Sequence, residues 1–570
     1  MCKLKTLEQH VRHYAVTIIV LLLFCVIVWR LLDLSYFNRE KYYKSLERAR
    51  NSIITIPAKR GTIFDRNFET LACDRTKIVL GVDPYVADSE KDLQKIFLLA
   101  ELLDMDVKNI LEKFVKKCKI SNNRKKKIRW VPICEIDSDS LHTAIEAIKI
   151  RGVYGIKSPH RSYPFGRQTA HVTGFVNKQN VPICGVEKYM NFYLQGQDGY
   201  IESEKDGRTV ELVQYRKKEI LCKDGNDIVL TIDKNIQKIV YDEVSQMVEK
   251  FSPQSISVIV SEVLSGEILA LVNYPDYDPN NYGNSPPENM KNLAVCNVYE
   301  PGSVFKIIAM SFGLEYGLSD EDSIFDCTLA SVMNRGRKVT MPKDHTPFDK
   351  LTFTEAIRKS SNRAAVQMAM LIGEQDFYNC VKSYGFGEKA GYGFDAESPG
   401  ILRPITKWDA WTITRMPMGH SIGAVPLQTH CAISVIANDG ILLKPNLFKH
   451  VMEGDQKILT MNPVIRRRVI SPQTAFHMRK IMHNPQKDKL PNGIEFGGKS
   501  GTGQKIVNGQ YSHHQHTSSY GGFFPVDAPK IIITVIVDDA KVTDGTAWGS
   551  VVSLPAFKNI AEKIAQYLEL

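Results

Sequence analysis

Residues 14–32 constrain the fold of this chain more than any other stretch. From Tyr14 to Trp29 no residue is charged and most are aliphatic, and two leucines follow Arg30. This length just reaches the ~17–25 residues that an α-helix needs to cross a bilayer. A cleaved signal peptide would need small residues before its cut site, and none stand there. The sequence therefore predicts an uncleaved transmembrane anchor.

The predicted anchor separates a short tail, residues 1–13, from the rest of the chain. With 570 residues, the chain should hold two or more folded domains. Basic residues flank the anchor on both sides, so flanking charge does not favour a cytoplasmic tail. Because long domains can translocate regardless of that charge, the orientation has to follow from the chemistry of the large part.

Composition and charge exclude few classes of function. The chain is 43% hydrophobic and 24% charged, which is ordinary for a globular protein. A net charge of +10 permits an anionic partner such as a membrane surface or cell-wall polymer. Much of the excess lies in residues 116–127, where we expect a solvated loop and, without interleaved aromatic residues, no nucleic-acid binding. Eleven cysteines without a C-x-x-C pair predict neither a zinc site nor a disulfide framework, and His513, His514 and His516 favour a polar turn over a metal site.

Residues 33–226 show the pattern of a β-rich region without catalytic residues. Two β-rich runs between Ile53 and Arg66 are broken at Pro57 and Gly61. Further expected elements are helices at 35–51 and 92–117 and a strand at 169–176. We predict a pedestal domain that binds or dimerises but does no chemistry.

Residues 227–570 combine strands at both ends with helices between them. The expected elements are a strand at 227–233, a helix capped by Asp233, a hairpin turning at Ser265-Gly266, a helical middle to about 440, strands at 518–524 and 530–537, and a helix at 555–570. Such an order predicts an α/β layer fold with one antiparallel sheet flanked by helices.

One serine and one lysine lie where a buried helix is expected to begin. Pro301 and Gly302 end the preceding element, and an apolar run starts at Ser303. Ser303 and Lys306 then lie one turn apart on one helix face. The helix dipole favours negative charge developing on the serine oxygen, and a desolvated lysine amine can serve as its base. Ser303 is the only serine followed three residues on by lysine, although a capping serine before a helical lysine has the same pattern.

Two further motifs follow in the same region. Ser360 and Asn362 precede an apolar run, at a loop or helix start, and a glycine-dense stretch surrounds Lys499. Each motif alone is equally typical of a turn, a cap or a loop. Residues 493–500 also satisfy the nucleotide P-loop pattern, but no buried strand precedes them and the glycines after them disfavour a helix, so an ATPase is not favoured.

The three motifs in this order resemble those of the penicillin-binding proteins, S-x-x-K, S-x-N and K-[ST]-G. Further stretches that resemble the family are 60–66, 419–428 and 519–527, so the resemblance covers nearly the whole chain. No glycosyltransferase domain fits between the anchor and the pedestal. The chain is therefore similar to the monofunctional class B members, and most similar to the cell-division type.

The resemblance implies a fold, a reaction and a role for each motif residue. The fold would be a serine β-lactamase/transpeptidase-like domain over 227–570, preceded by the pedestal and one transmembrane helix. Ser303 would attack the D-alanyl-D-alanine end of a peptidoglycan stem peptide, with Lys306 as its base and Ser360 as a proton relay. Asn362 would hold the substrate amide and the Lys306 amine.

The third motif would bind the substrate. Lys499 would lower the proton affinity of the neighbouring amine and attract the terminal carboxylate. Thr502 would contact that carboxylate and complete the oxyanion hole with the backbone N–H of Ser303. Ser500 and Gly501 would also bind the substrate, and the resemblance implies neither a metal nor a cofactor.

The resemblance also implies partners and a location. β-Lactams would trap Ser303, and the catalytic domain would lie on the outer side of the cytoplasmic membrane, beside a membrane glycosyltransferase and divisome proteins. Alternatives are an elongation-type transpeptidase, a non-catalytic divisome scaffold, a penicillin-sensing receptor and a class A β-lactamase. The β-lactamase would need a glutamate that activates water, and only Glu397 lies near the expected place, outside the usual pattern.

Overall fold

The computed structural model describes residues 2–116, 118–121, 124–128, 130–136, 138–205, 211–393, 397–507, 510–543 and 545–570. These residues form two compact units: Met1–Lys59 with Gly196–Gly225, and Arg60–Gln195 with Asn226–Leu570. We describe each unit by itself.

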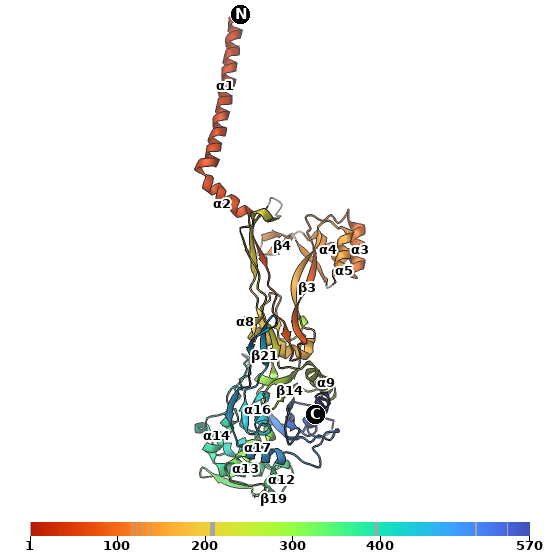
Figure 1. Cartoon of the computed structure of the whole chain (residues 1–570), viewed down its shortest axis with the longest axis vertical. Helices are drawn as coiled ribbons and strands as arrows, with labels where there is room; N and C mark the ends of the chain where they lie inside the picture. Colours follow the sequence, from red (N-terminus) through yellow and green to blue (C-terminus); the bar gives the residue numbers. More distant parts are fainter. Residues whose placement is uncertain are drawn as a thin grey trace. The chain divides into compact units, whose positions relative to one another are not determined.

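The first unit begins with a long helix, α1 (Cys2–Leu32), which contains the predicted anchor (Figure 1). The helical segment Val11–Phe37, which begins in α1 and ends with the turn that follows it, is long and apolar enough to cross a membrane. A π-helical turn, η1 (Asp33–Phe37), and the polar helix α2 (Arg39–Arg50) follow, where a helix was predicted. The unit ends in a four-stranded sheet made of β1 (Asn51–Ile56), β10 (Gly199–Lys205), β11 (Glu211–Leu212) and β12 (Lys218–Ile220).

The second unit contains a seven-stranded sheet with strands from both sides of residue 226. Its order is β22 (Gln456–Thr460), β21 (Phe448–Glu453), β13 (Asp227–Leu230), β2 (Ile63–Phe64), β3 (Thr70–Val82) and β6 (Val131–Ile136), with β7 (Val153–Ser162) also paired to β3. β13 runs parallel to β2 and antiparallel to β21. The sheet is thus continuous across the position where a domain boundary was predicted, and that boundary stays a prediction.

Three helices pack on β3 and β6 of this sheet: α3 (Leu93–Leu103), α4 (Val107–Val115) and α5 (Asp139–Ile148). The helical pattern at 92–117 is therefore two helices instead of one. Asp104 adopts a left-handed conformation with φ of 49° and ends the first helix. Asp106 accepts a hydrogen bond from the backbone of Lys108 and caps the second.

Two short predictions from local pattern were wrong. Residues 169–176 alternate like a strand, but they form the buried helix α6 (Ala170–Thr173) followed by β8 (Phe175–Val176). Every residue of that helix is buried, so alternation carries no information about which face meets the core.

The basic run 116–127 contains the hairpin strands β4 (Cys118–Ser121) and β5 (Arg124–Lys127) instead of a loop, while residues 117, 122 and 123 lie outside the described residues.

The second unit also contains a five-stranded antiparallel sheet, as predicted. Its order is β15 (Ile268–Tyr274), β14 (Ser255–Glu262), β26 (Ile531–Asp538), β25 (Gln510–Phe524) and β24 (Gly497–Val507). β14 and β15 form the hairpin predicted at Ser265-Gly266. β24 is the edge strand, so within the described ranges no strand pairs with one row of its backbone groups.

Helices cover both faces of this sheet, which explains why apolar residues of its central strands β14 and β26 point to both faces. On one face α9 (Lys234–Phe251) and α18 (Ser553–Tyr567) pack against Val258 and Val535. Asp233 caps α9 through the backbone N–H groups of Asn235 and Ile236, as predicted. On the other face α11 (Lys306–Glu315) and α16 (Pro426–Ala437) pack against Ile259 and Ile532.

The predicted helical middle supplies the rest of this layer (Figure 1). It contains α10 (Leu293–Cys296), α12 (Phe353–Arg358), α13 (Asn362–Ile372), α14 (Glu374–Ser383), α15 (Thr412–Arg415) and, after the middle, α17 (Pro472–Ile481). Twelve buried residues of α11 and α16 are within the same hydrophobic cluster as α13, so these helices form one core behind the motif residues.

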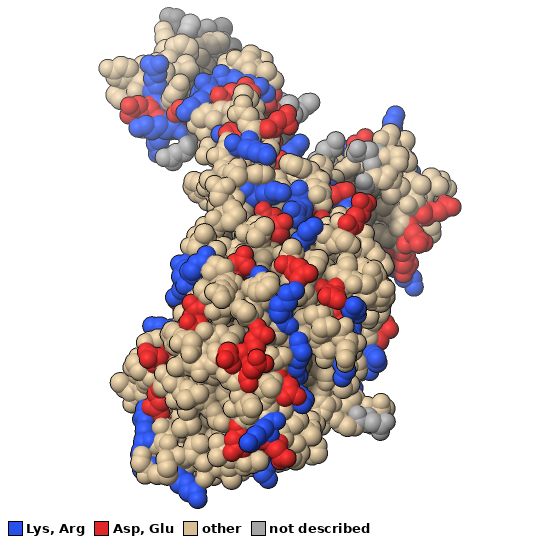
Figure 2. Space-filling view, turned by 60° about the horizontal axis from the view of Figure 1, so that its bottom comes forward, with Lys and Arg blue, Asp and Glu red and all other residues tan. Residues whose placement is uncertain are grey.

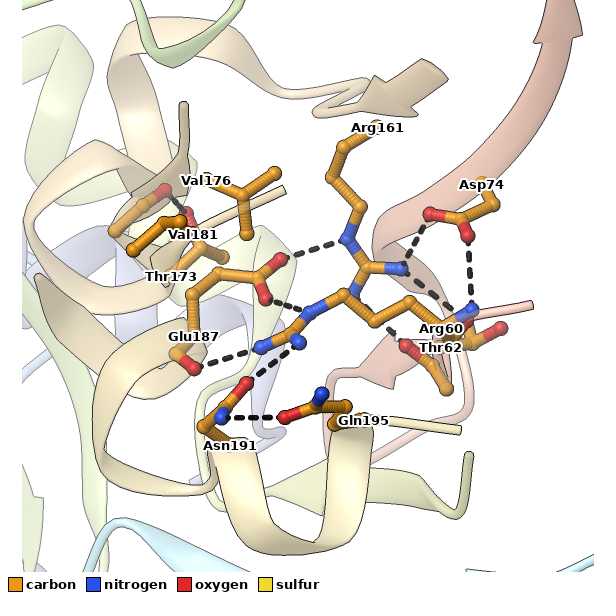
Figure 3. A network of polar contacts seen from close by, with 12 residues as sticks. Arg60, Thr62, Asp74, Arg161, Thr173, Val176, Val181, Glu187, Asn191 and Gln195 are labelled. Atoms are coloured by element: carbon orange, nitrogen blue, oxygen red, sulfur yellow. Dashed lines mark hydrogen bonds and ion pairs between the residues drawn. The ribbon is translucent and has the colours of Figure 1, made fainter. Parts of the chain in front are cut away.

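A buried charge network ties β3, β7 and α7 (Gly185–Tyr189) together (Figure 3). Arg60 and Arg161 each donate to a different carboxylate oxygen of Glu187, at 2.5 and 2.7 Å. Asp74 accepts from the guanidinium of Arg161 at 3.1 Å and from the backbone of Arg60 at 2.8 Å. Asn191 accepts a further bond from Arg60 at 2.7 Å. We call Arg60, Asp74, Arg161, Glu187 and Asn191 the arginine network.

Charges on the surface are mixed. On the face shown in Figure 2, lysine and arginine side chains are interspersed with aspartate and glutamate. That distribution matches the modest net charge of the sequence.

Candidate active site

Ser303 lies in a tight helical turn that leads directly into a buried helix. The turn is the 3₁₀-helix η6 (Gly302–Phe305), and α11 begins at Lys306. In a 3₁₀ turn, side chains three residues apart lie above one another, which places Lys306 one turn after Ser303 on the same side. Ser303 is half-buried, and Lys306 is only 3% exposed.

Two glycines allow this turn to lie close to its neighbours. Gly302 has a φ of +60°, and a Cβ there would come within 2.7 Å of the backbone oxygen of Thr502. A Cβ on Gly501 would lie 2.8 Å from the backbone oxygen of Pro301. The close approach of β24 to the serine turn is the reason for the glycines that the sequence shows around Lys499.

Ser360 sits in the tight connection between α12 and α13. Its φ is +59°, a left-handed conformation that is uncommon for residues other than glycine. Ser361 is the N-cap of α13 and accepts a hydrogen bond from the backbone of Ala364 at 3.2 Å. Ser360 and Asn362 thus flank a helix N-terminus, where the sequence placed them.

Lys499 lies on the edge strand β24. The residues of the P-loop pattern belong to this strand and to the turn before it, so no helix follows them. Lys499 pairs across the ladder with Gly521, and Thr502 with Ser518. The nucleotide-binding interpretation is therefore wrong, because a P-loop needs a helix N-terminus at this point.

The side chains of Lys306 and Lys499 meet at the hydroxyl group of Ser360. The Lys306 amine donates to that hydroxyl at 3.2 Å and also to the backbone oxygen of Ser360. The Lys499 amine donates to the same hydroxyl at 2.9 Å and to the backbone oxygen of Ser500 at 3.0 Å. Residues 54 and 139 positions apart in the sequence are thus joined at one oxygen atom.

The two amines have lowered proton affinities. Burial lowers the pKa of Lys306 well below its usual value, and the positive charge of Lys499 lowers it further, while Asp344 opposes the change. Burial also lowers the pKa of Lys499 to about 8. Because the charged form of an amine is the one that burial disfavours, Lys306 is suited to accept a proton near neutral pH.

The side chains of two further predicted site residues form hydrogen bonds with other groups, not with Lys306, Ser360 or Lys499. The amide nitrogen of Asn362 donates to the backbone oxygen of Lys343 at 2.7 Å, instead of contacting Lys306. The hydroxyl of Thr502 accepts from the backbone of Gly549 at 3.1 Å. Ser500 is half-buried and Gly501 is buried on the same strand.

Sequence reasoning missed the segments that hold the motifs in place. Asp344 binds the start of α13, and a Cβ on Gly549 would come within 2.4 Å of the backbone oxygen of Gly501. Gly419, in a stretch noted only for its resemblance, packs on the backbone of Gly302. A lone aspartate or glycine in a polar loop carries no periodic signal that could have revealed these contacts.

No group of three or more His, Cys, Asp and Glu side chains in the described ranges is arranged to hold a metal ion. Glu397, the residue weighed for a β-lactamase, accepts a hydrogen bond from the backbone of Gly391 at 2.9 Å.

Residues 256–562, more than half of the chain, match the family described as the penicillin binding protein transpeptidase domain. The chain belongs to the penicillin-binding proteins. In this penicillin-binding protein, residues 55–230 also match the penicillin-binding protein dimerisation domain. The predictions of the family, of the fold and of a serine-type acyltransferase are therefore confirmed.

Relatives of this penicillin-binding protein match along most of its length. Stage V sporulation protein D of Bacillus subtilis is 28% identical over 554 residues, covering 95% of this chain and 84% of the relative. The peptidoglycan D,D-transpeptidase FtsI of Buchnera aphidicola is 25% identical over 563 residues, covering 97% and 94%.

Solved structures show the same fold. Penicillin-binding protein 2X from Streptococcus thermophilus aligns with a TM-score of 0.73 at 21% identity, over 90% of this chain and 80% of that one. Penicillin-binding protein 3 from Mycobacterium tuberculosis aligns with a TM-score of 0.66 at 24% identity, over 91% and 98%.

Proposed function

We propose that this penicillin-binding protein is a monofunctional, class B peptidoglycan D,D-transpeptidase that cross-links stem peptides through an acyl-enzyme on Ser303. One observation carries the proposal: two buried lysine amines share the hydroxyl of Ser360, and one of these lysines, Lys306, lies one helical turn after Ser303. Buried amines without a carboxylate partner are costly, and they are retained where chemistry needs a neutral base.

Acylation follows from the roles of these groups. The oxygen of Ser303 attacks the carbonyl carbon of the penultimate D-alanine while its proton passes to the Lys306 amine. The negative charge on the carbonyl oxygen is stabilised by the backbone N–H groups of Ser303 and Thr502. When the C–N bond breaks, Ser360 passes the proton from Lys306 to the departing D-alanine.

Substrate binding uses the free edge of β24. An extended stem peptide can add to this edge as a further strand, because no described strand pairs with the backbone groups there. Lys499 and the hydroxyl of Thr502 bind the terminal carboxylate, and Ser500 and Gly501 offer the backbone groups of the strand. Asn362, at the start of α13, holds the substrate amide.

An amine from a second stem peptide then attacks the ester carbonyl and forms the cross-link, whereas water would only trim the donor. A β-lactam acylates Ser303 in the same way, but its ring-opened product stays attached. The helix α1 anchors the chain in the cytoplasmic membrane with the catalytic domain outside, where peptidoglycan lies. Similarity to FtsI favours a role in septal wall synthesis beside a membrane glycosyltransferase and divisome proteins.

Transfer between defined peptides tests the proposal. The full-length chain in detergent micelles is mixed with a peptide ending in D-Ala-D-Ala and an amine acceptor, and the products are identified by mass spectrometry. We expect D-alanine release and an acceptor adduct from the wild type and neither from Ser303→Ala. Unchanged stem peptide with a folded wild type would favour a divisome scaffold, and rapid release of bound penicillin would favour a β-lactamase.

A further inference from the structure

Asp344 binds the start of α13 from a separate loop. This loop connects β18 (Arg337–Thr340) with β19 (Lys350–Thr352), so Asp344 belongs neither to α13 nor to any of the three motifs. One carboxylate oxygen accepts from the hydroxyl of Ser361 at 2.9 Å. The other accepts from the backbone N–H groups of Asn362 and of Arg363, the latter at 3.3 Å.

The carboxylate of Asp344 lies at the N-terminus of α13, where a negative charge is favourable and makes the hydrogen bonds stronger. The first N–H groups of a helix have no partner within the helix, and its N-terminus carries partial positive charge. Hydrogen bonds from such groups to an ionised carboxylate are stronger than neutral ones. The same loop also binds the side chain of Asn362 through the backbone oxygen of Lys343 at 2.7 Å.

The residue that this arrangement restrains is Ser360. Its left-handed φ of +59° is unfavourable for a serine and persists only where the surroundings determine it. The bonds of Asp344 begin at the next residue, Ser361, and hold the α13 end of the connection between α12 and α13. The Ser360 hydroxyl then stays between the two amines at 3.2 and 2.9 Å.

We propose that Asp344 is a positioning residue for acyl transfer, which holds Ser360 and Asn362 against the two lysines by binding the N-terminus of α13. This inference rests on the proposed function. Asp344 touches neither substrate nor the reacting atoms in this account. It acts through Ser360 and Asn362 and through its charge.

The charge of Asp344 gives a signature that a structural role alone would not produce. Lys306 faces Lys499 on β24, Asp344 on its loop and His420, whose pKa burial lowers to about 4, so that it is neutral near pH 7. Of these groups, Asp344 is the one that raises the proton affinity of Lys306. Acylation should increase with pH as Lys306 loses its proton, so removing the charge should move this increase to lower pH.

The test compares three variants of the full-length chain by their rates of acylation with a fluorescent penicillin from about pH 5 to about pH 9. Asp344→Asn keeps the shape of the side chain without its charge. We expect the maximal acylation rate to fall about tenfold and the increase of the rate with pH to occur at lower pH. Asp344→Ala also removes the hydrogen bonds, and about a 10²-fold loss is expected from the misplaced hydroxyl. If that variant does not fold, Asp344→Asn alone decides.

Glu315→Gln is a matched control. Glu315 accepts from the backbone and hydroxyl of Ser471 at 2.9 and 2.8 Å and so binds the start of another helix, α17, away from the lysines. We expect Glu315→Gln to lower the free energy of unfolding but to leave the acylation rate and its dependence on pH unchanged. The inference is overturned if Asp344→Asn acylates like the wild type, or if Glu315→Gln shifts the pH dependence equally. Failure of the wild type itself to acylate would overturn the proposed function as well.

Discussion

The arginine network and the pair of Lys306 and Lys499 are both buried clusters of basic side chains. They differ in whether carboxylates bind the basic groups. In the arginine network, Arg60 and Arg161 bind Glu187 and Asp74, so each charge has a partner. Around Ser360, two amines share a hydroxyl group and backbone oxygens, and no described carboxylate forms an ion pair with either amine.

The proton affinities of the two clusters differ accordingly. Burial alone would lower the pKa of Arg161, but the charges of Glu187 and Asp74 outweigh it and raise the pKa. For Lys306, burial and the charge of Lys499 act in the same direction and lower the pKa. A guanidinium stays protonated, whereas a buried amine can lose its proton. The paired cluster therefore stabilises the fold, and the unpaired cluster is available for chemistry.

The largest expected effect is the loss of acylation in Lys306→Met. Without the base, the rate of penicillin acylation should fall by about 10⁴-fold or more. The free energy of unfolding should stay the same or rise by about 1 kcal/mol, because a buried amine without a carboxylate partner is replaced by an apolar side chain. Stopped-flow acylation and urea unfolding measure the two quantities. Lys359→Met is the control, since its amine binds Glu355 at 2.8 Å on the surface, and it should leave both unchanged.

Glu187→Gln should have the opposite result, a large loss of stability with little change in acylation. Removing this fully buried carboxylate leaves two guanidinium groups without their shared partner, and the free energy of unfolding should fall by about 3–5 kcal/mol. Acylation by the folded fraction should be unchanged. Glu135→Gln breaks an exposed pair with Lys77 at 3.3 Å and should cost no more than about 1 kcal/mol. Equal losses in the two variants would contradict the role given to the arginine network.

Gly302→Ala tests whether the serine turn depends on close approach to β24. A left-handed φ costs an alanine about 1–2 kcal/mol, and the added Cβ would also press on Thr502. Gly317 has nearly the same φ, +63°, with no atom within 4 Å of its Cβ position. Gly317→Ala should therefore lose only the conformational part, measured by thermal unfolding, and retain acylation. Comparable acylation in both variants would show that the contact does not matter.

The most gradual expected effect is on stability as a function of pH. The pKa of Lys499 is about 8 in the folded protein, below the value of about 10.4 in an unfolded chain. Between these values the unfolded chain binds more protons, so the free energy of unfolding should rise with pH, by at most about 1.4 kcal/mol per pH unit from this group. Urea unfolding of the wild type against Lys499→Met measures the difference, and parallel curves above pH 8 would contradict the lowered pKa.

Sequence reasoning succeeded where a signal is local. The spacing of Ser303 and Lys306 needs only one helical turn, and Asp233 caps a helix through residues directly after it. The hairpin at Ser265-Gly266 also follows from composition within a few residues. The edge strand around Lys499 was not predicted, because its glycines are equally typical of a loop. Local signals thus predicted the other four strands of the sheet and the helices behind it.

Sequence reasoning failed where a contact joins distant segments or where burial removes the pattern. The network between Arg60 and Glu187 spans 127 positions, and nothing near either residue announces the other. Asp344 acts on a helix that begins 18 residues later. The helix at Ala170–Thr173 is buried on all sides, so its alternation of residue types says nothing about its secondary structure.

The most direct test of the central claim is the intact mass of the full-length protein after incubation with benzylpenicillin, followed by digestion to locate the adduct. We predict a stable increase by the mass of one whole antibiotic on the peptide that contains Ser303, lost in Ser303→Ala and strongly slowed in Lys306→Met. No adduct on the folded wild type, or an adduct that persists in Ser303→Ala, would contradict the claim that the unpaired lysines serve acyl transfer to this serine.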